Sequence, residues 1–119
     1  MLDIVLVDDD NVSTFVTEQY IRRNLSDPHR IHKFSSALDA LQHIVDINPE
    51  YLFLDLVMPQ MTGWDFLDQL KDIKLNSEVY ILSGSLDKSD IDKANDNIIV
   101  KKFLPKLTVK ECIPEIFRN

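Results

Sequence analysis

The sequence predicts an α/β fold, in which a doubly wound, five-stranded parallel sheet carries helices on both faces. Five short apolar segments typical of strands alternate along the 119 residues with five amphipathic segments typical of helices. Such strict alternation requires right-handed crossovers, which place helices on both faces of a parallel sheet. No repeat, linker or low-complexity tract interrupts the pattern, so we expect one domain over residues 1–119 without an output domain.

The first strand and helix flank an acidic cluster. Residues 2–7 are apolar and β-branched, as in a strand, whereas residues 8–11 (Asp-Asp-Asp-Asn) are of types that end strands and cap helices. We therefore expect a helix from this cluster to about Asn24. The apolar residues at helical spacing that would face the core are Val12, Phe15, Val16 and Tyr20.

The second strand and helix follow Pro28, which ends the first helix. Residues 29–34 predict a short strand, and Ser35 or Ser36 is expected to cap the helix after it. The predicted inner face of this helix is formed by Ala37, Leu38, Leu41, Ile44 and Val45.

The central strand leads to a single carboxylate. Residues 51–54 are large and apolar, lie between Pro49 and Pro59, and predict a buried strand that ends at or near Asp55. A short loop and Gly63 precede a third helix, which begins at Trp64. Its predicted inward residues are Phe66, Leu67, Leu70 and Ile73.

Two further strand and helix pairs complete the chain. Residues 78–82 predict a strand that closes on Ser83, and a weaker helix follows over about residues 88–95. Residues 100–104 predict the fifth strand. Thr108 is expected to cap the last helix, with Val109, Cys112, Ile113, Ile116 and Phe117 on one face. Pro114 lies inside that helix, so we expect a kink or fraying there.

Composition excludes several classes of function. The net charge of −7 disfavours nucleic-acid binding, which requires a basic surface. A single cysteine excludes an internal disulfide and fits a reducing compartment. The first apolar run is too short for a membrane span or a signal sequence, so we expect a cytoplasmic protein that does not enter membranes.

The strand ends predict one shared site. In the flavodoxin-like strand order 2-1-3-4-5, strands one and three are neighbours, and ligands bind where the order reverses. Asp8 and Asp9 should therefore lie beside Asp55. Carboxylates this close repel one another strongly, and a hard cation such as Mg²⁺ would relieve that repulsion. Strands four and five should bring the Ser83 hydroxyl and the Lys106 ammonium group to the same edge.

In combination, these motifs resemble the receiver domain of bacterial two-component response regulators, in its stand-alone, chemotaxis-regulator-like form. The resemblance covers the whole chain. The matching segments are Val7-Asp8-Asp9, residues 54–59 (Leu-Asp-Leu-Val-Met-Pro) with Gly63, Ser83-Gly84, and Phe103 with Lys106.

The resemblance implies a role for each matching residue. Asp55 would accept a phosphoryl group from a histidine kinase or a histidine phosphotransfer protein. Asp8, Asp9, Asp55 and the backbone carbonyl of Val57 would hold Mg²⁺, with Asp9 a more direct ligand than Asp8. Lys106 would neutralise added charge. Ser83 and Phe103 would act as switch residues. The protein would then be a regulator and not an enzyme, although it could slowly remove its own phosphoryl group.

Signalling would pass through a protein-binding face. In the resembled family this face is formed by the fourth helix, the fifth strand and the fifth helix, here about residues 88–95, 100–104 and 109–117. The chain departs from the family at one point, because Leu107 and not proline follows Lys106. That departure leaves open whether the Lys106–Leu107 peptide is cis.

Two other functions are compatible with parts of the sequence. The chain could be a receiver-like binding module that works without phosphorylation. Alternatively, residues 4–12 resemble the first motif of haloacid-dehalogenase-type phosphatases, with Asp8 as nucleophile and Asp10 as acid/base. The phosphatase hypothesis leaves Asp55 without a role, and the sequence shows no cap insertion.

Overall fold

The computed structural model describes residues 1–117, so residues 118–119 of the expected domain lie outside the described part. Strands and helices alternate along the chain as predicted. The strands are β1 (Leu2–Val7), β2 (His29–Phe34), β3 (Tyr51–Asp55), β4 (Glu78–Ser83) and β5 (Val100–Pro105). The helices are α1 (Asn11–Asn24), α2 (Ala37–Ile47), α3 (Gly63–Leu70), α4 (Lys88–Asp96), the short 3₁₀ helix η1 (Lys106–Thr108) and α5 (Val109–Ile116).

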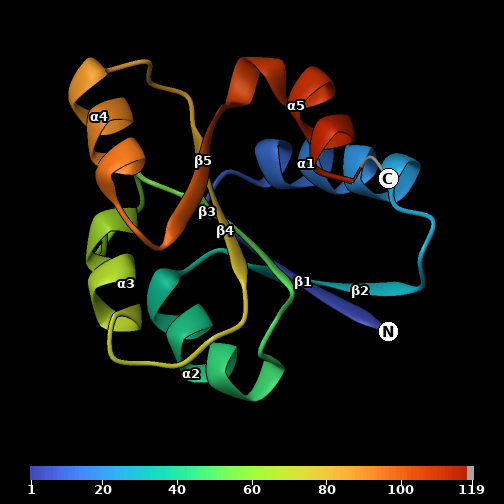
Figure 1. The fold of residues 1–119 in the computed structure, drawn as a ribbon, viewed down its shortest axis with the longest axis horizontal. Helices are drawn as coiled ribbons and strands as arrows, with labels where there is room; N and C mark the ends of the chain where they lie inside the picture. Colours follow the sequence, from blue (N-terminus) through green and yellow to red (C-terminus); the bar gives the residue numbers. More distant parts are fainter. Residues whose placement is uncertain (118–119) are drawn as a thin grey trace.

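The five strands form one parallel sheet in the order β2-β1-β3-β4-β5, which confirms the predicted fold class and strand order. Helices α1 and α5 cover one face, and α2, α3 and α4 cover the other (Figure 1). Strands β1 and β3 are neighbours at the centre, where the order reverses. Within the described residues, no helix is both long and apolar enough to cross a membrane.

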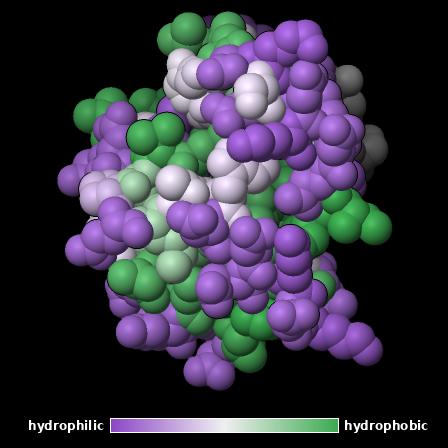
Figure 2. Space-filling model, turned by 90° about the vertical axis from the view of Figure 1, so that its left-hand side faces the viewer, coloured by the Kyte–Doolittle hydropathy of each residue, from purple (hydrophilic) through white to green (hydrophobic). Residues whose placement is uncertain are grey.

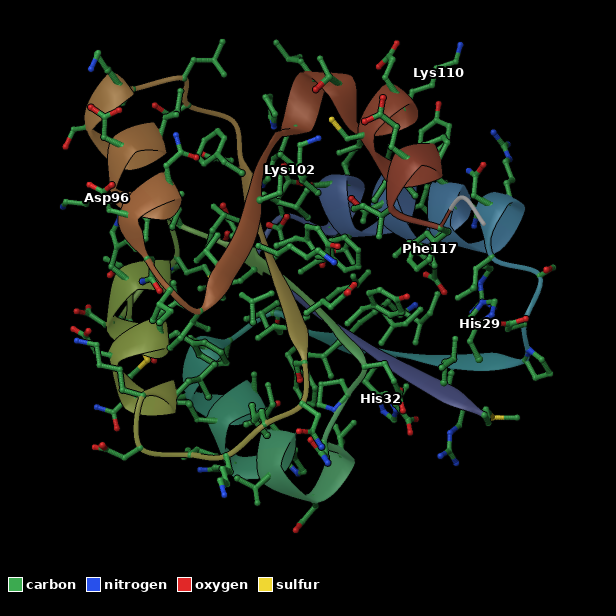
Figure 3. The ribbon with its side chains drawn as sticks, viewed as in Figure 1. His29, His32, Asp96, Lys102, Lys110 and Phe117 are labelled. Atoms are coloured by element: carbon green, nitrogen blue, oxygen red, sulfur yellow. The ribbon has the colours of Figure 1, made fainter. Side chains whose placement is uncertain are left out.

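Two apolar cores hold the sheet between its helix layers. Alternate residues of β1 point to opposite faces: Val5 and Val7 join the core under α2, α3 and α4, while Ile4 and Leu6 join the core under α1 and α5. Phe53 of β3 is fully buried in the second core and stacks on Tyr80 of β4, with 5.3 Å between ring centroids. Figure 3 shows Phe117 beneath α5, on the same side of the sheet.

The predicted inner face of the first helix is wrong in part. Val12 and Phe15 are 72% and 61% exposed, and the buried residues of α1 are Thr17, Glu18 and Ile21. Glu18 can be buried because its carboxylate forms ion pairs with both Arg22 and Lys33. Val16 and Tyr20 are partly buried against the second core, as expected.

The second helix differs in the same way. Leu38 and Val45 are exposed, and α2 instead buries Ala37, Ala40 and Ile44. The small side chains of the two alanines allow the helix to approach the sheet closely, and this turns the larger Leu38 and Val45 outward. Ser36, one of the two predicted caps, accepts a hydrogen bond from the Asp39 N–H.

The end of the chain also differs from expectation. Thr108 lies at the predicted position before α5 but makes no capping hydrogen bond to it; its hydroxyl donates to the Pro105 carbonyl instead. Helix α3 ends at Leu70, although Ile73 still packs on the core from the turn that follows. Helix α5 continues two residues past Pro114, to Ile116. The kink or fraying expected at Pro114 stays a prediction.

Two phenylalanines provide a direct stability test of these faces. Phe53→Ala should lower the free energy of unfolding by about 3–5 kcal/mol, because it empties a fully buried site. Phe15→Ala should change it by no more than about 0.5 kcal/mol, since the side chain is mostly in solvent. Urea unfolding followed by circular dichroism measures both. Similar losses for the two variants would contradict the placement of α1.

Candidate functional site

The acidic cluster lies at the carboxyl ends of β1 and β3. Val7 pairs with Leu54 in the parallel register, so the next residues along the two strands, Asp8 and Asp55, lie side by side. Both side chains are buried, whereas Asp9 is exposed. One carboxylate oxygen from each of the three residues lies within 4.8 Å of the other two. The structure therefore brings together the three acids that the sequence predicted.

Lys106 reaches the same cluster from the end of β5. Its Nζ lies 2.9 Å from Asp8 Oδ2 and 3.6 Å from Asp55 Oδ2, and only 20% of its side chain is exposed. Burial opposes the charged form of Lys106, but the adjacent carboxylates of Asp8 and Asp55 outweigh it and raise the pKa of Lys106. The ammonium group is thus held charged between the two buried carboxylates.

The electrostatics of Asp55 set it apart from the other acids. Burial, followed by the negative charge of Asp8, raises the pKa of Asp55 from 3.8 to about 6. Lys106 and a hydrogen bond from the Val57 N–H to Asp55 Oδ1, at 3.4 Å, offset this in part. The Asp55 carboxyl group therefore loses its proton just below neutral pH. The resulting carboxylate is more basic than that of an ordinary aspartate.

The other predicted site residues lie around this cluster in different ways. Ser83 is buried at the end of β4, one residue beyond the register partner of Asp55, and its Oγ accepts a hydrogen bond from the Ser85 N–H. The Val57 side chain is 71% exposed beside the acids. Phe103 is partly buried on β5 and packs against the core under α2, α3 and α4.

Gly63 supports the loop that carries Asp55, a role that the sequence analysis missed. Its N–H donates to the Leu56 carbonyl at 2.9 Å. A Cβ at this position would lie 2.6 Å from the Asp55 carbonyl oxygen and 2.9 Å from Leu56 Cα, both closer than atoms can approach. The signal was available, since the chain has only two glycines and this one follows the acid by eight residues.

The residues of the cluster fit a hard divalent cation. Asp8 Oδ2 is buried and makes no well-directed hydrogen bond, although Lys106 Nζ is near. One ammonium group against three carboxylates leaves net negative charge, and the donors are all oxygens. Mg²⁺ prefers such donors together with water. The described residues show no other group of three potential ligands.

The remaining acid of the first motif has a structural task. Asp10 is the N-cap of α1, and its side chain accepts hydrogen bonds from the Val12 and Ser13 N–H groups. Its carboxylate is therefore already engaged by the helix, which does not favour the acid/base role of the phosphatase hypothesis. No cis peptide bond occurs within residues 1–117, so the Lys106–Leu107 bond is trans.

Comparison with known proteins gives one consistent family. The family model described as the response regulator receiver domain matches residues 4–116. The chain is 24% identical over 118 residues to response regulator protein VraR of Staphylococcus saprophyticus. That alignment covers 99% of this chain and 56% of VraR, so the chain spans just over half the length of its curated relative.

Solved structures share the fold over nearly the whole chain. A DNA-binding response regulator of the LuxR family from Staphylococcus aureus is 25% identical, with a TM-score of 0.83 over 98% of this chain and 96% of that one. A two-component response regulator from Cytophaga hutchinsonii is 24% identical, with a TM-score of 0.80 and coverage of 96% and 98%. The Mn²⁺-bound form of response regulator Rcp1 is 18% identical, with a TM-score of 0.82 and coverage of 98% and 91%.

The two glycines allow a matched test of the loop that carries Asp55. Gly63→Ala should lower the free energy of unfolding by about 1–3 kcal/mol, because the new Cβ overlaps backbone atoms of Asp55 and Leu56. Gly84→Ala is the control, since no atom beyond the adjacent residues lies within 4 Å of a Cβ there, and the change should be neutral or slightly stabilising. Urea unfolding measures the free energy of unfolding of both variants and of the native chain. Equal stability of the two would contradict the close packing at Gly63.

The raised pKa of Asp55 predicts a pH-dependent stability in metal-free buffer. The folded protein keeps a proton on Asp55 up to about pH 6, whereas the unfolded chain loses it near the ordinary value of 3.8. Stability contributed by this group is therefore present below about pH 4 and is lost as pH rises through 6. The loss amounts to about 2–3 kcal/mol of the free energy of unfolding. Asp55→Asn should abolish it, because asparagine does not titrate.

Urea unfolding at several pH values between 4 and 7.5, in EDTA, measures this difference between the native chain and Asp55→Asn. The exposed Asp46→Asn is the control and should follow the native chain at every pH. A constant difference between the native chain and Asp55→Asn over this range would show that Asp55 titrates normally.

Proposed function

This chain belongs to the response regulator receiver domain family, and from that premise we propose that Asp55 accepts a phosphoryl group in the presence of Mg²⁺. Membership places the chain in two-component signalling as a receiver domain. The observation that carries the proposal is the cluster of Asp8, Asp9 and Asp55 with the Lys106 ammonium group between two of its carboxylates.

The chemistry follows from the state of Asp55. Once ionised, an Asp55 carboxylate oxygen attacks the phosphorus of a phosphohistidine on a donor protein. A phosphorus–oxygen bond forms as the phosphorus–nitrogen bond breaks, the electron pair leaves with the imidazole, and Asp55 becomes an acyl phosphate. Because its pKa is about 6, the carboxylate is mostly ionised at neutral pH and more basic than an ordinary aspartate.

The surrounding residues would stabilise the added charge. Asp8, Asp9, Asp55 and the backbone carbonyl of Val57 would hold Mg²⁺, with Asp9 the more direct ligand. When bound, Mg²⁺ supplies positive charge to the phosphoryl oxygens. Response regulator Rcp1, which has the same fold, is known in a Mn²⁺-bound form. The Lys106 Nζ is already 3.6 Å from Asp55 Oδ2 and would form an ion pair with one oxygen of a phosphoryl group on Asp55.

Ser83 and Phe103 are proposed as the switch residues. The Ser83 hydroxyl now accepts from the Ser85 N–H, which leaves its own hydrogen free to donate to a phosphoryl oxygen on Asp55. A movement of Ser83 toward that group would open space beside β5, into which the partly buried Phe103 ring could turn. A local change of charge would thereby bias a two-state element.

The partners proposed are proteins. A histidine kinase or histidine phosphotransfer protein would donate the phosphoryl group in the cytoplasm, and a downstream protein would bind the face formed by α4, β5 and α5. Figure 3 shows Asp96, Lys102 and Lys110 projecting from these three elements. The S. aureus relative is described as a DNA-binding response regulator, and that description applies to that protein.

Treatment with acetyl phosphate and Mg²⁺ tests the proposal. The native chain should gain the mass of one phosphoryl group, and Asp55→Asn should gain none, because it lacks the nucleophile. Asp46→Asn, an exposed acid on α2, should behave like the native chain. Intact-mass spectrometry measures all three.

An unmodified native chain would instead favour a binding module that works without phosphorylation. Steady hydrolysis of a phosphomonoester that is lost in Asp10→Ala, but kept in Asp55→Asn, would favour the phosphatase hypothesis.

A further inference from the structure

A tryptophan joins the helix after the phosphoacceptor loop to the helix after Ser83. Trp64 lies in the first turn of α3, and its indole Nε1–H donates to Asp90 Oδ1 of α4 at 3.2 Å. Lys93, one turn further along α4, places its Nζ 5.8 Å from the centroid of the same ring. The indole thus contacts α4 through a charge-assisted hydrogen bond and a cation–π interaction.

Trp64 is fixed relative to Asp55. The residue before it, Gly63, donates to the Leu56 carbonyl and packs directly on the Asp55 carbonyl oxygen. The start of α3 is closed by a capping box between Thr62 and Asp65. Phe66, two residues on, is fully buried. The indole is therefore attached to the phosphoacceptor loop with little freedom.

Helix α4 is fixed relative to Ser83 by a series of hydrogen bonds. The Ser85 N–H donates to Ser83 Oγ (3.1 Å), the Asp87 N–H to Ser85 Oγ (3.2 Å), and the Ser89 N–H to Asp87 Oδ1 (2.9 Å). Each side chain holds the backbone two residues ahead, from the buried hydroxyl to the N-cap of α4. A displacement of Ser83 is therefore passed to the first turn of α4, where Asp90 lies.

The apolar core beneath α4 is small. Within this helix Ala94 alone is buried, and its hydrophobic contact is small because the side chain is a single methyl group. Figure 1 shows α4 and α3 one above the other on the same side of the sheet. Figure 2, which faces this side, shows a largely hydrophilic surface with smaller pale and green areas. The Trp64 contacts thus give α4 a polar link to α3, in addition to its packing on β5.

We propose that the Trp64–Asp90–Lys93 contact restrains α4 in its unphosphorylated position, and that phosphorylation of Asp55 acts against this restraint. The inference rests on the proposed function, in which Ser83 moves toward a phosphoryl group on Asp55. That movement shifts α4 relative to α3, and a hydrogen bond of 3.2 Å does not survive such a shift unchanged. A contact made in one state only couples the two sites.

The coupling must be reciprocal, and this provides the decisive experiment. If the contact favours the unphosphorylated state, removing it should make Asp55 bind a phosphoryl mimic more tightly. Beryllofluoride with Mg²⁺ is the probe, and ¹⁹F NMR titration measures its affinity. Trp64→Phe keeps a ring but has no N–H donor, so its affinity should rise by about 2- to 10-fold, the range for one lost hydrogen bond.

Variants of α4 separate this contact from general effects of charge. Asp90→Ala should tighten beryllofluoride binding like Trp64→Phe, and Asp90→Asn should do so less, because its amide oxygen can still accept from the indole. Asp92→Ala is the matched control: Asp92 is on the same helix but pairs with Lys88, and its affinity should match the native chain. Unchanged or weaker binding in both Trp64→Phe and Asp90→Ala would overturn the inference.

The indole itself gives an independent measurement. Trp64 is the only tryptophan in the chain, so the tryptophan emission reports the surroundings of this indole alone. Beryllofluoride with Mg²⁺ should change the emission of the native chain and leave that of Asp55→Asn unchanged. An unaltered emission while ¹⁹F NMR shows beryllofluoride bound at Asp55 would overturn the inference and leave the proposed function intact. No beryllofluoride and no phosphoryl adduct at Asp55 would overturn both.

Discussion

The Lys106 ammonium group between Asp8 and Asp55 is the interaction on which the site depends. Two carboxylates at about 4 Å repel each other by about 4 kcal/mol at an effective dielectric constant of 20. The Lys106 Nζ offsets this repulsion from 2.9 Å and 3.6 Å, and Lys106 comes directly after β5, which lies two strands away from β3. The offset is incomplete, since the pKa of Asp55 is still raised to about 6. The site therefore favours additional positive charge, which is the property that a cation-assisted phosphoryl acceptor requires.

The two apolar cores keep this repulsive cluster together. Strands β1 and β3 are buried on both faces. Their parallel pairing holds Asp8 and Asp55 side by side despite the repulsion between the two carboxylates. Gly63 adds a second constraint, because its lack of a side chain lets α3 begin directly against the Asp55 carbonyl. Apolar burial in the two cores thus offsets the unfavourable electrostatics of the site. Such a balance is common where charged groups are held together for function.

The same architecture separates rigid from weakly held elements. Phe66 and Leu67 anchor α3 in the core, whereas α4 buries Ala94 only. The hydrogen bonds from Ser83 to Ser89 and the indole of Trp64 compensate for that small core. Because polar contacts of this kind depend steeply on geometry, α4 is the helix whose position responds most readily to a change of charge at the strand ends.

The sequence by itself determined the fold class, the strand order and the group of acids at the strand ends. Alternation and apolar runs report burial of whole strands, and parallel strands bring their carboxyl ends to one edge without further information. It did not determine which side of each helix is buried. Val12 and Phe15 have the spacing of core residues but lie in solvent, while Glu18 is buried because Arg22 and Lys33 happen to meet its carboxylate. Only the tertiary structure decided these faces, the close approach at Gly63 and the contact of Trp64 with α4, because each depends on atoms that come from distant parts of the chain.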